Sequence, residues 1–485
     1  MAAVTELSFV GKKFLPMFKN GVFSSEVEMA RKIMEFYRTF GLWISYSKRV
    51  KDQLVIHVKS EPGLREHASS NDASADHCAI IPAVIPCGTV SRRAVEKTWM
   101  TASNSKKDSA GSEFKSLIEA PVGYKFVGAD VDSEELWIAS LFGESLFEGG
   151  IHGASAIGWM TLQGSKQEGT DLHSRTAQIL GISRNEAKVF NYSRIYGSGK
   201  KHAMQLLMQV PGADGKPRTE QECEETVVKL YEATKGVKRS YKSKYAGGSE
   251  SFLFNYLEKR AGMDKCRTPI LSAEICNSLA CENTGDKLFL TTRMNWIVQS
   301  SAVDFLHCLI VSMDYLMKRY EIGGRLAITI HDEIRYLVAE EDVYRASLAL
   351  QISHLWTRAL FCERCDFDDL PMSVAFFSLV DVDSVLRKET YQQCLTPTQK
   401  TQIEAGKSYE IKELLDKLSS THGGPDALVK PDSLVGESKA MSQASYKPFG
   451  KQDPLSLDDG FDLGSLRNSL HEQIGLNCGE QRRRK

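Results

Sequence analysis

The sequence predicts an α+β fold in which a sheet domain is interrupted by a long helical insertion. Strand-like segments occur on both sides of that insertion, at residues 124–131 and again at 326–338. Between them, residues 146–290 have mostly helical patterning with Gly-rich connections, and an amphipathic helix from Asn295 to Tyr320 leads back to the strands. The chain therefore leaves the sheet once and returns to it.

The composition is that of a globular protein with two to four domains or one large multi-lobed unit. The 485 residues are 42% hydrophobic and 25% charged, with a net charge of −1 and a pI of about 6.8. No overall basic character indicates nucleic-acid binding, so any such site must be local. The 11 cysteines are scattered, and the isolated pair Cys362 and Cys365 lacks a second pair that would predict a zinc site.

The two ends of the chain carry few structural signals. The N-terminal residues 1–21 have the pattern of neither a secretory signal nor a transit peptide, and an amphipathic helix is expected from Ser25 to Phe40. We find no apolar run that looks long enough to cross a membrane, so no membrane partner is expected. Residues 419–485 are rich in Ser, Gly, Asp and Lys, which predicts a disordered tail.

Three titratable residues lie between two predicted strands. Residues 326–330 and 334–338 have strand patterning, and His331, Asp332 and Glu333 separate them. A hairpin turn normally favours Gly or Asn-Gly, and neither is present. On this stretch alone, a solvated turn containing an Asp is the simpler interpretation.

A second unusual carboxylate is Asp130, which lies inside the strand predicted from Phe126 to Val131. Asp132 can be explained as the N-cap of the following helix, with Glu135 at the third helical position as in a capping box. An acid in a strand interior is unfavourable unless it is paired or binds a metal. If Asp130 and Asp332 face each other from adjacent strands, they would suit Mg²⁺, and a pair of ions would favour phosphoryl transfer.

The stretch from 181 to 199 predicts a helix with one ordered face. Ser183 and Glu186 form a capping box, and Gly197 would end the helix. Two cations and two aromatics recur at intervals of four and so lie on one side of the helix: Arg184, Lys188, Tyr192 and Tyr196. Such a strip could hold a triphosphate and a base, although an ordinary solvated face is the alternative.

Two weaker features leave their alternatives open. Residues 235–245, KGVKRSYKSKY, interleave basic and aromatic residues, which fits either a nucleic-acid contact or a solvated loop. His173 is a lone histidine, and such a residue is more often structural than functional.

These motifs together resemble DNA polymerases of family A. The Arg184-x3-Lys188-x3-Tyr192-x3-Tyr196-Gly197 pattern resembles the helix motif of the fingers, GADVDSEEL the first palm motif, and His331-Asp332-Glu333 the last. The stretches GTVSRRAVEKTWMTASN, GWMTLQGSKQEGTDLHSRTA, NWIVQSSAVDFLH and DLPMSVAFFSLVDVDSVLRKE are similar to those of the mitochondrial, gamma-type members. The resemblance covers most of residues 88–395.

The resemblance implies a role for each motif residue. Two Mg²⁺ ions would be held by Asp130, Asp332 and Val131. The incoming dNTP would be bound by Arg184, Lys188, Tyr192, Tyr196, Glu135 and His173. Glu135 would exclude a ribose 2′-hydroxyl, and Tyr192, where many relatives have Phe, would permit dideoxynucleotides. Contacts to DNA would come from Arg93, Arg293, Gln299 and His331.

The resemblance also implies the organisation and the activity. The expected parts are residues 1–87 as a remnant before the palm, 88–145 and 291–418 as the palm, and 146–290 as the fingers, with the thumb and exonuclease domains apparently missing. The activity would be template-directed DNA synthesis from dNTPs on primer-template DNA in the mitochondrion, with the accessory subunit of gamma-type enzymes as a further candidate partner. A non-catalytic DNA-binding fragment and a single-subunit RNA polymerase remain alternatives.

Overall fold

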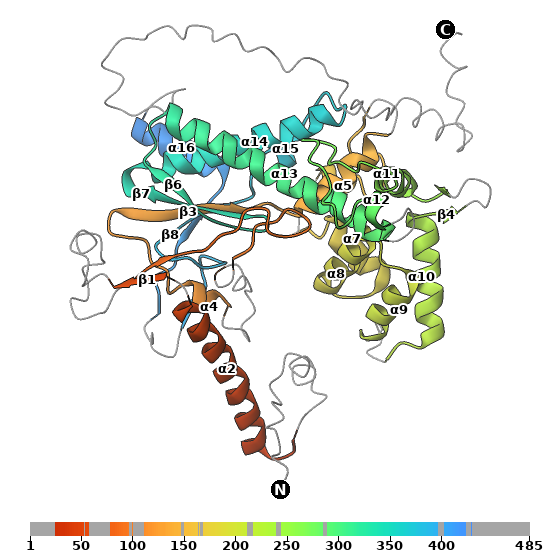
Figure 1. The fold of residues 1–485 in the computed structure, drawn as a ribbon, viewed down its shortest axis with the longest axis horizontal. Coiled ribbons are helices and arrows are strands. Elements are labelled where there is room, and N and C mark those ends of the chain that lie inside the picture. Colours follow the sequence, from red (N-terminus) through yellow and green to blue (C-terminus); the bar gives the residue numbers. More distant parts are fainter. Residues whose placement is uncertain are drawn as a thin grey trace.

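A computed structural model describes residues 25–428 apart from short gaps, which are 53, 58–77, 97–98, 100–110, 147–149, 163, 165–167, 211–216, 239–243, 285–288, 396–401 and 423–427. It confirms the predicted α+β class (Figure 1). The main sheet has five strands in the order β6-β7-β3-β8-β9, and every neighbouring pair is antiparallel. These strands are β3 (Tyr124–Asp130), β6 (Gly324–Ile330), β7 (Glu333–Ala339), β8 (Val380–Asp383) and β9 (Lys407–Tyr409).

Strand β3 lies in the middle of the sheet and is buried on both faces. Val127 and Ala129 belong to the large core beneath α13 (Leu290–Arg319) and α14 (Val343–Arg364). Phe126 points into a smaller core on the opposite face, with Trp99 and side chains of α2 (Glu28–Lys51) and α4 (Gly111–Lys115). Gly128 lies so close to β7 that a Cβ there would meet the Ile334 carbonyl oxygen at 2.2 Å. The apolar, glycine-containing sequence of β3 therefore follows from its central position.

The insertion after β3 forms a helical lobe beside the sheet (Figure 1). Its first helix, α5 (Glu134–Glu144), is buried along its whole length and joins the lobe to the core. The remaining elements of the lobe are α6 (Trp159–Leu162), α7 (Leu172–Leu180), α8 (Arg184–Ile195), α9 (Lys200–Met208), α10 (Glu220–Thr234), β4 (Val237–Lys238), β5 (Tyr245–Ala246), α11 (Ser251–Ala261) and α12 (Cys281–Thr284).

Helix α13 corrects one sequence-based expectation. It is long and apolar enough to cross a membrane, although we expected no run of that length. However, 61% of its most apolar stretch is buried within the protein, where α13 packs against α14 and α11. It also carries the fully buried charged residues Arg293 and Asp304. These features are typical of a core helix.

The remaining elements extend the fold at its two ends. The N-terminal helix α2 runs to Lys51, beyond the expected end at Phe40, and is followed by β1 (Leu54–His57) and β2 (Cys78–Ile81). Near the other end are η3 (Glu340–Asp342), α15 (Met372–Ala375) and α16 (Ile411–His422). Helix α16 includes residues 419–422 and Leu428 is buried, so the expected start of a disordered tail at 419 was wrong. The rest of that tail lies outside the described residues.

Candidate active site

Two carboxylates meet at one end of the sheet. Ile330 pairs with Glu333 to close the β6–β7 hairpin, and His331 and Asp332 form its two-residue turn, with φ 59° at His331. On the neighbouring strand, Asp130 pairs with Glu333, and the Val131 amide donates to the Asp332 carbonyl at 3.0 Å. The backbone thus places Asp332 beside Asp130 at the ends of adjacent strands, as the sequence predicted.

The electrostatics of this pair favour a bound cation. Burial, followed by the negative charge of Asp130, raises the pKa of Asp332 from its usual 3.8 to about 7. The Asp130 side chain is 45% exposed, so its carboxylate is open to solvent and to ligands. Among the described residues no cluster of three or more His, Cys, Asp and Glu side chains is placed to hold a metal. A two-carboxylate site completed by water and phosphate oxygens is one that Mg²⁺ accepts, so the donor chemistry fits.

The start of α5 differs from the expected capping box. The N-cap is Ser133, in the left-handed region at φ 47°, and its side chain makes no capping bond. Asp132 instead accepts a hydrogen bond from the Ser378 hydroxyl. The prediction of Asp132 as N-cap was therefore wrong, because a residue distant in sequence binds its carboxylate.

Glu135 joins the sheet to the helical lobe. Its side chain is buried, and its carboxylate accepts hydrogen bonds from the Arg93 guanidinium and the Tyr196 hydroxyl. Burial raises the pKa of Glu135, while the positive charge of Arg93 opposes that change. Three of the predicted site residues are thus in direct contact.

The predicted strip on α8 is present and ends near two carboxylates. The capping box between Ser183 and Glu186 is confirmed. The Lys188 ammonium lies 5.8 Å from the centroid of the Tyr192 ring, which is 6.0 Å from that of Tyr196. Burial and then the negative charges of Glu135 and Asp332 raise the pKa of Tyr192. The aromatic end of the strip therefore lies near Glu135 and Asp332.

Arg184, at the outer end of the strip, is bound to another residue. Its Nη2 donates to Asp171 Oδ2 at 2.8 Å and its Nε donates to the same oxygen at 3.2 Å. Lys188, one turn further along, is exposed. The two cations thus differ, because Lys188 is open to a ligand whereas Arg184 must leave Asp171 to bind one.

His173 lies beneath the same strip. The Asn191 side-chain amide is 3.1 Å from Nδ1, and the Tyr192 ring is 6.1 Å away, centroid to centroid. Burial, followed by the charge of Arg184, lowers the pKa of His173 to about 4, so the ring is neutral at pH 7. If the amide donates to Nδ1, the proton is on Nε2, a buried atom without a hydrogen-bond partner in the described part of the chain. That N–H is available to an anionic oxygen.

The residues expected to contact DNA differ in how exposed they are. His331 is exposed at the turn and Gln299 is half-buried on α13. Arg293, in contrast, is fully buried in the first turn of α13, so its side chain would have to move to reach a ligand. The basic stretch at 235–245 is incomplete, since 239–243 lie outside the described residues.

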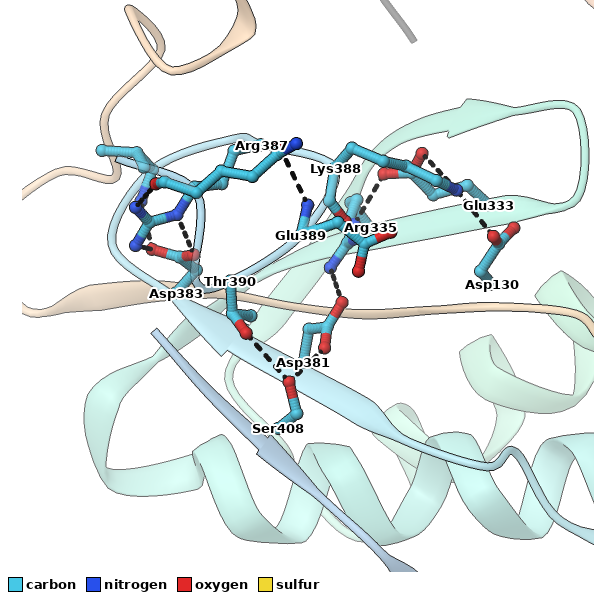
Figure 2. A network of polar contacts seen from close by, with 12 residues as sticks. Asp130, Glu333, Arg335, Asp381, Asp383, Arg387, Lys388, Glu389, Thr390 and Ser408 are labelled. Atoms are coloured by element: carbon cyan, nitrogen blue, oxygen red, sulfur yellow. Dashed lines mark hydrogen bonds and ion pairs between the residues drawn. The ribbon is translucent and has the colours of Figure 1, made fainter. Parts of the chain in front are cut away.

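The cation beside Asp130 was not predicted from the sequence. Lys388 Nζ is 2.6 Å from Asp130 Oδ2 and 3.6 Å from Glu333 Oε2 (Figure 2). Glu333 is buried and bound to Arg335 at 2.8 Å. Lys388 is in the stretch VLRKE, which contributed to the family resemblance, but nothing in that stretch indicates a partner 258 positions away.

Comparison with known proteins identifies relatives over most of the chain. The model of DNA polymerase family A matches residues 95–360. The chain is 48% identical over 455 residues to the mitochondrial DNA polymerase gamma of Neurospora crassa, covering 92% of this chain and 30% of that protein. It is 49% identical over 434 residues to DNA polymerase gamma of Saccharomyces cerevisiae, with 88% and 34% covered. It is 41% identical over 460 residues to DNA polymerase subunit gamma-1 of Gallus gallus, with 84% and 70% covered. The chain thus spans about a third of the length of these two fungal relatives.

Proposed function

Because this chain belongs to DNA polymerase family A, we propose that it carries the polymerase centre of a gamma-type enzyme and extends a primer with dNTPs. The observation that carries the proposal is the carboxylate corner, the end of the sheet at which the hairpin turn brings Asp332 beside Asp130. The aromatic end of the α8 strip lies near Asp332 and Glu135. Residues 88–145 and 291–418 would then form the palm, and residues 146–290 the fingers.

The carboxylate corner would hold the two Mg²⁺ ions through Asp130, Asp332 and the main chain of Val131. Bound there, Mg²⁺ lowers the pKa of a coordinated hydroxyl and neutralises phosphate charge. The protein's own contribution is positional, because Asp130 lies in paired backbone and Asp332 lies in a two-residue turn that the Val131 amide ties to β3.

The α8 strip would bind the triphosphate. Lys188 is exposed and would contact the phosphates first, and Arg184 would join it after exchanging Asp171 for a phosphate oxygen. The neutral His173 would donate Nε2–H to another phosphate oxygen. All three groups then act on the same charged part of the substrate.

The sugar would lie against Glu135 and the two tyrosines. Glu135 is held by Arg93 and Tyr196, so a 2′-hydroxyl would meet a fixed carboxylate. A dideoxynucleotide lacks the 3′-hydroxyl and its contact. The Tyr192 hydroxyl would supply that contact instead, so the dideoxynucleotide would be accepted. Tyr196 would border the nascent base pair.

The remaining partners belong to the same proposal. Primer-template DNA would be contacted by Arg93, Arg293, Gln299 and His331. A mitochondrial location is supported by the name of the Neurospora relative, mitochondrial DNA polymerase gamma. The animal relatives are named as subunits, which supports an accessory subunit as a further partner.

The test is primer extension on a primed template with Mg²⁺ and dNTPs. The intact chain should extend the primer and Asp332→Asn should not, whereas Asp314→Asn, which changes an exposed acid of α13, should extend it normally. Primer-template binding without extension by the intact chain would instead favour a non-catalytic DNA-binding role.

The same assay distinguishes a DNA polymerase from a single-subunit RNA polymerase. With ribonucleotides supplied, the intact chain should add almost none and Glu135→Ala should add more, because the variant removes the carboxylate beside the sugar. Glu225→Ala, on the exposed face of α10, is the matched control. Full exclusion of ribonucleotides by Glu135→Ala would remove the proposed role of Glu135.

A further inference from the structure

The ammonium of Lys388 is bound to Asp130, one of the two carboxylates that we propose to hold a cation. Its Nζ lies 2.6 Å from Asp130 Oδ2, and its side chain is only 20% exposed (Figure 2). A Mg²⁺ ion bound to that oxygen would lie about 2.1 Å from it, so the two cations would compete for one acceptor and repel each other.

Glu333, the other carboxylate in an ion pair with Lys388, has cationic partners of its own. Glu333 is bound to Arg335 at 2.8 Å, and Lys115 lies 3.6 Å from Glu333 Oε2 on the buried side. Lys388 is also 3.6 Å from that oxygen, a full ångström further than from Asp130. Asp130, in contrast, has no cation other than Lys388 within ion-pair distance in the described part of the chain. Of its two ion pairs in the described part of the chain, Lys388 therefore makes the shorter one with Asp130.

The loop that carries Lys388 is anchored on both sides. The buried Arg387 donates to both Asp383 carboxylate oxygens, at 2.7 and 3.0 Å, and to the Gln392 carbonyl at 2.6 Å. Arg335, which binds Asp381 at 3.0 Å, also donates to the Lys388 carbonyl at 3.5 Å. Figure 2 shows how these contacts tie the loop to β8. The backbone of Lys388 is thus fixed against β7 and β8, unlike that of a mobile surface lysine.

We propose that Lys388 is a positioning residue that acts as an internal counter-ion, neutralising Asp130 until a divalent cation displaces its ammonium. This inference rests on the proposed function, since it takes the corner of Asp130 and Asp332 to be the cation site. The positive charge keeps the two carboxylates together in the metal-free protein, and it weakens cation binding because each incoming ion must displace it. Lys388 touches no reacting atom in this role.

The experiment is a direct Mn²⁺ titration of the full chain, followed by electron paramagnetic resonance, with no DNA or dNTP present. Lys388→Met should bind Mn²⁺ about tenfold more tightly than the intact chain, because the competing charge is gone. Lys388→Arg keeps the charge and should bind as weakly as the intact chain. Lys125→Met removes a lysine from the other end of β3, where it pairs with Glu340 at 3.3 Å, and should change nothing.

Asp130→Asn separates failure of this inference from failure of the proposed function. If Asp130→Asn abolishes Mn²⁺ binding but Lys388→Met binds no more tightly than the intact chain, the cation site stands and the counter-ion role is rejected. If Asp130→Asn leaves Mn²⁺ binding unchanged, the corner is not the cation site and both proposals fall. Circular dichroism verifies the fold, and Lys388→Gln supplies the same loss of charge if the Met variant is unfolded.

Discussion

The carboxylate corner and the α8 strip are held in place by different means. At the corner, backbone pairing between β3, β7 and β6 fixes Asp130 and Asp332, and one amide-carbonyl bond at 3.0 Å ties the two strand ends together. On α8, the helix fixes only the spacing of the side chains, while Arg184 is bound to Asp171 and Lys188 is exposed. At the proposed metal site the backbone is therefore in place before substrate arrives and Lys388 is the side chain to be displaced, whereas at the proposed phosphate site the binding side chains themselves must rearrange.

This difference matches the ligand that each part of the proposed site would bind. A carboxylate fixed by a sheet can hold a cation with little movement of the backbone, which suits a group that must align reacting atoms. Long cationic side chains can follow a triphosphate as it enters and leaves, at the cost of ordering entropy. Variants in the two regions should therefore fail in different ways.

The largest effect expected in the strip is that of Lys188→Met. Removing the exposed ammonium should lower kcat by about 10²–10³-fold, the scale for loss of one preorganised charge-stabilising group. Lys200→Met, an exposed lysine at the start of α9, should leave kcat unchanged. Single-turnover extension with saturating dNTP measures both. Equal rates for the two variants would show that Lys188 does not act on the phosphates.

Tyr192→Phe should change substrate choice and leave ordinary extension nearly intact. Loss of the phenol removes one hydrogen bond, which corresponds to about tenfold weaker incorporation of a dideoxynucleotide. Competition between dNTP and the matching dideoxynucleotide gives the ratio directly. The proposed contact is wrong if the intact chain and the variant terminate equally often.

Asp171→Asn should improve the use of dNTP, and by less than the losses predicted for Lys188→Met and Tyr192→Phe. The variant releases Arg184 from its carboxylate, so the KM for dNTP should fall by up to about fivefold, the range for a partly exposed ion pair. Steady-state kinetics at several dNTP concentrations would measure it. A higher KM would mean that Asp171 orients Arg184 productively and does not compete with phosphate.

The sequence predicted the parts of the site that depend on local order. The hairpin, the capping box at Ser183 and the strip on α8 follow from periodicity and nearest neighbours, and the structure contains each of them. The adjacency of Asp130 and Asp332 was predicted from an acid expected inside a strand. The two residues are adjacent, but Asp130 is the last residue of β3 and its side chain is 45% exposed, so that premise was wrong.

The features that were missed depend on contacts between residues far apart in sequence. Asp132 is bound by Ser378, 246 positions away, and Asp130 by Lys388, 258 positions away. No local pattern encodes such pairs. The burial of Arg293 was missed for the same reason, since it depends on how the first turn of α13 packs into the core.

The smallest predicted effect concerns stability in EDTA. The fold favours the protonated form of Asp332, whose pKa is raised to about 7 from 3.8, so stability is lost as the pH rises from about 4 to 7. Asp332→Asn escapes this loss, and at pH 8 its Tm should exceed that of the intact chain by about 2–4 °C. The difference should vanish near pH 4. A Tm difference independent of pH would contradict this electrostatic cause.

The most direct test of the central claim is a double-mutant cycle on the two carboxylates, measured as single-turnover extension rates. If Asp130 and Asp332 act as one cation site, Asp130→Asn and Asp332→Asn should each reduce the rate by at least about 10³-fold, and the double variant should be little slower than either. If instead the two losses add, or either single variant keeps most of its rate, the carboxylates act separately and the single-site account is contradicted.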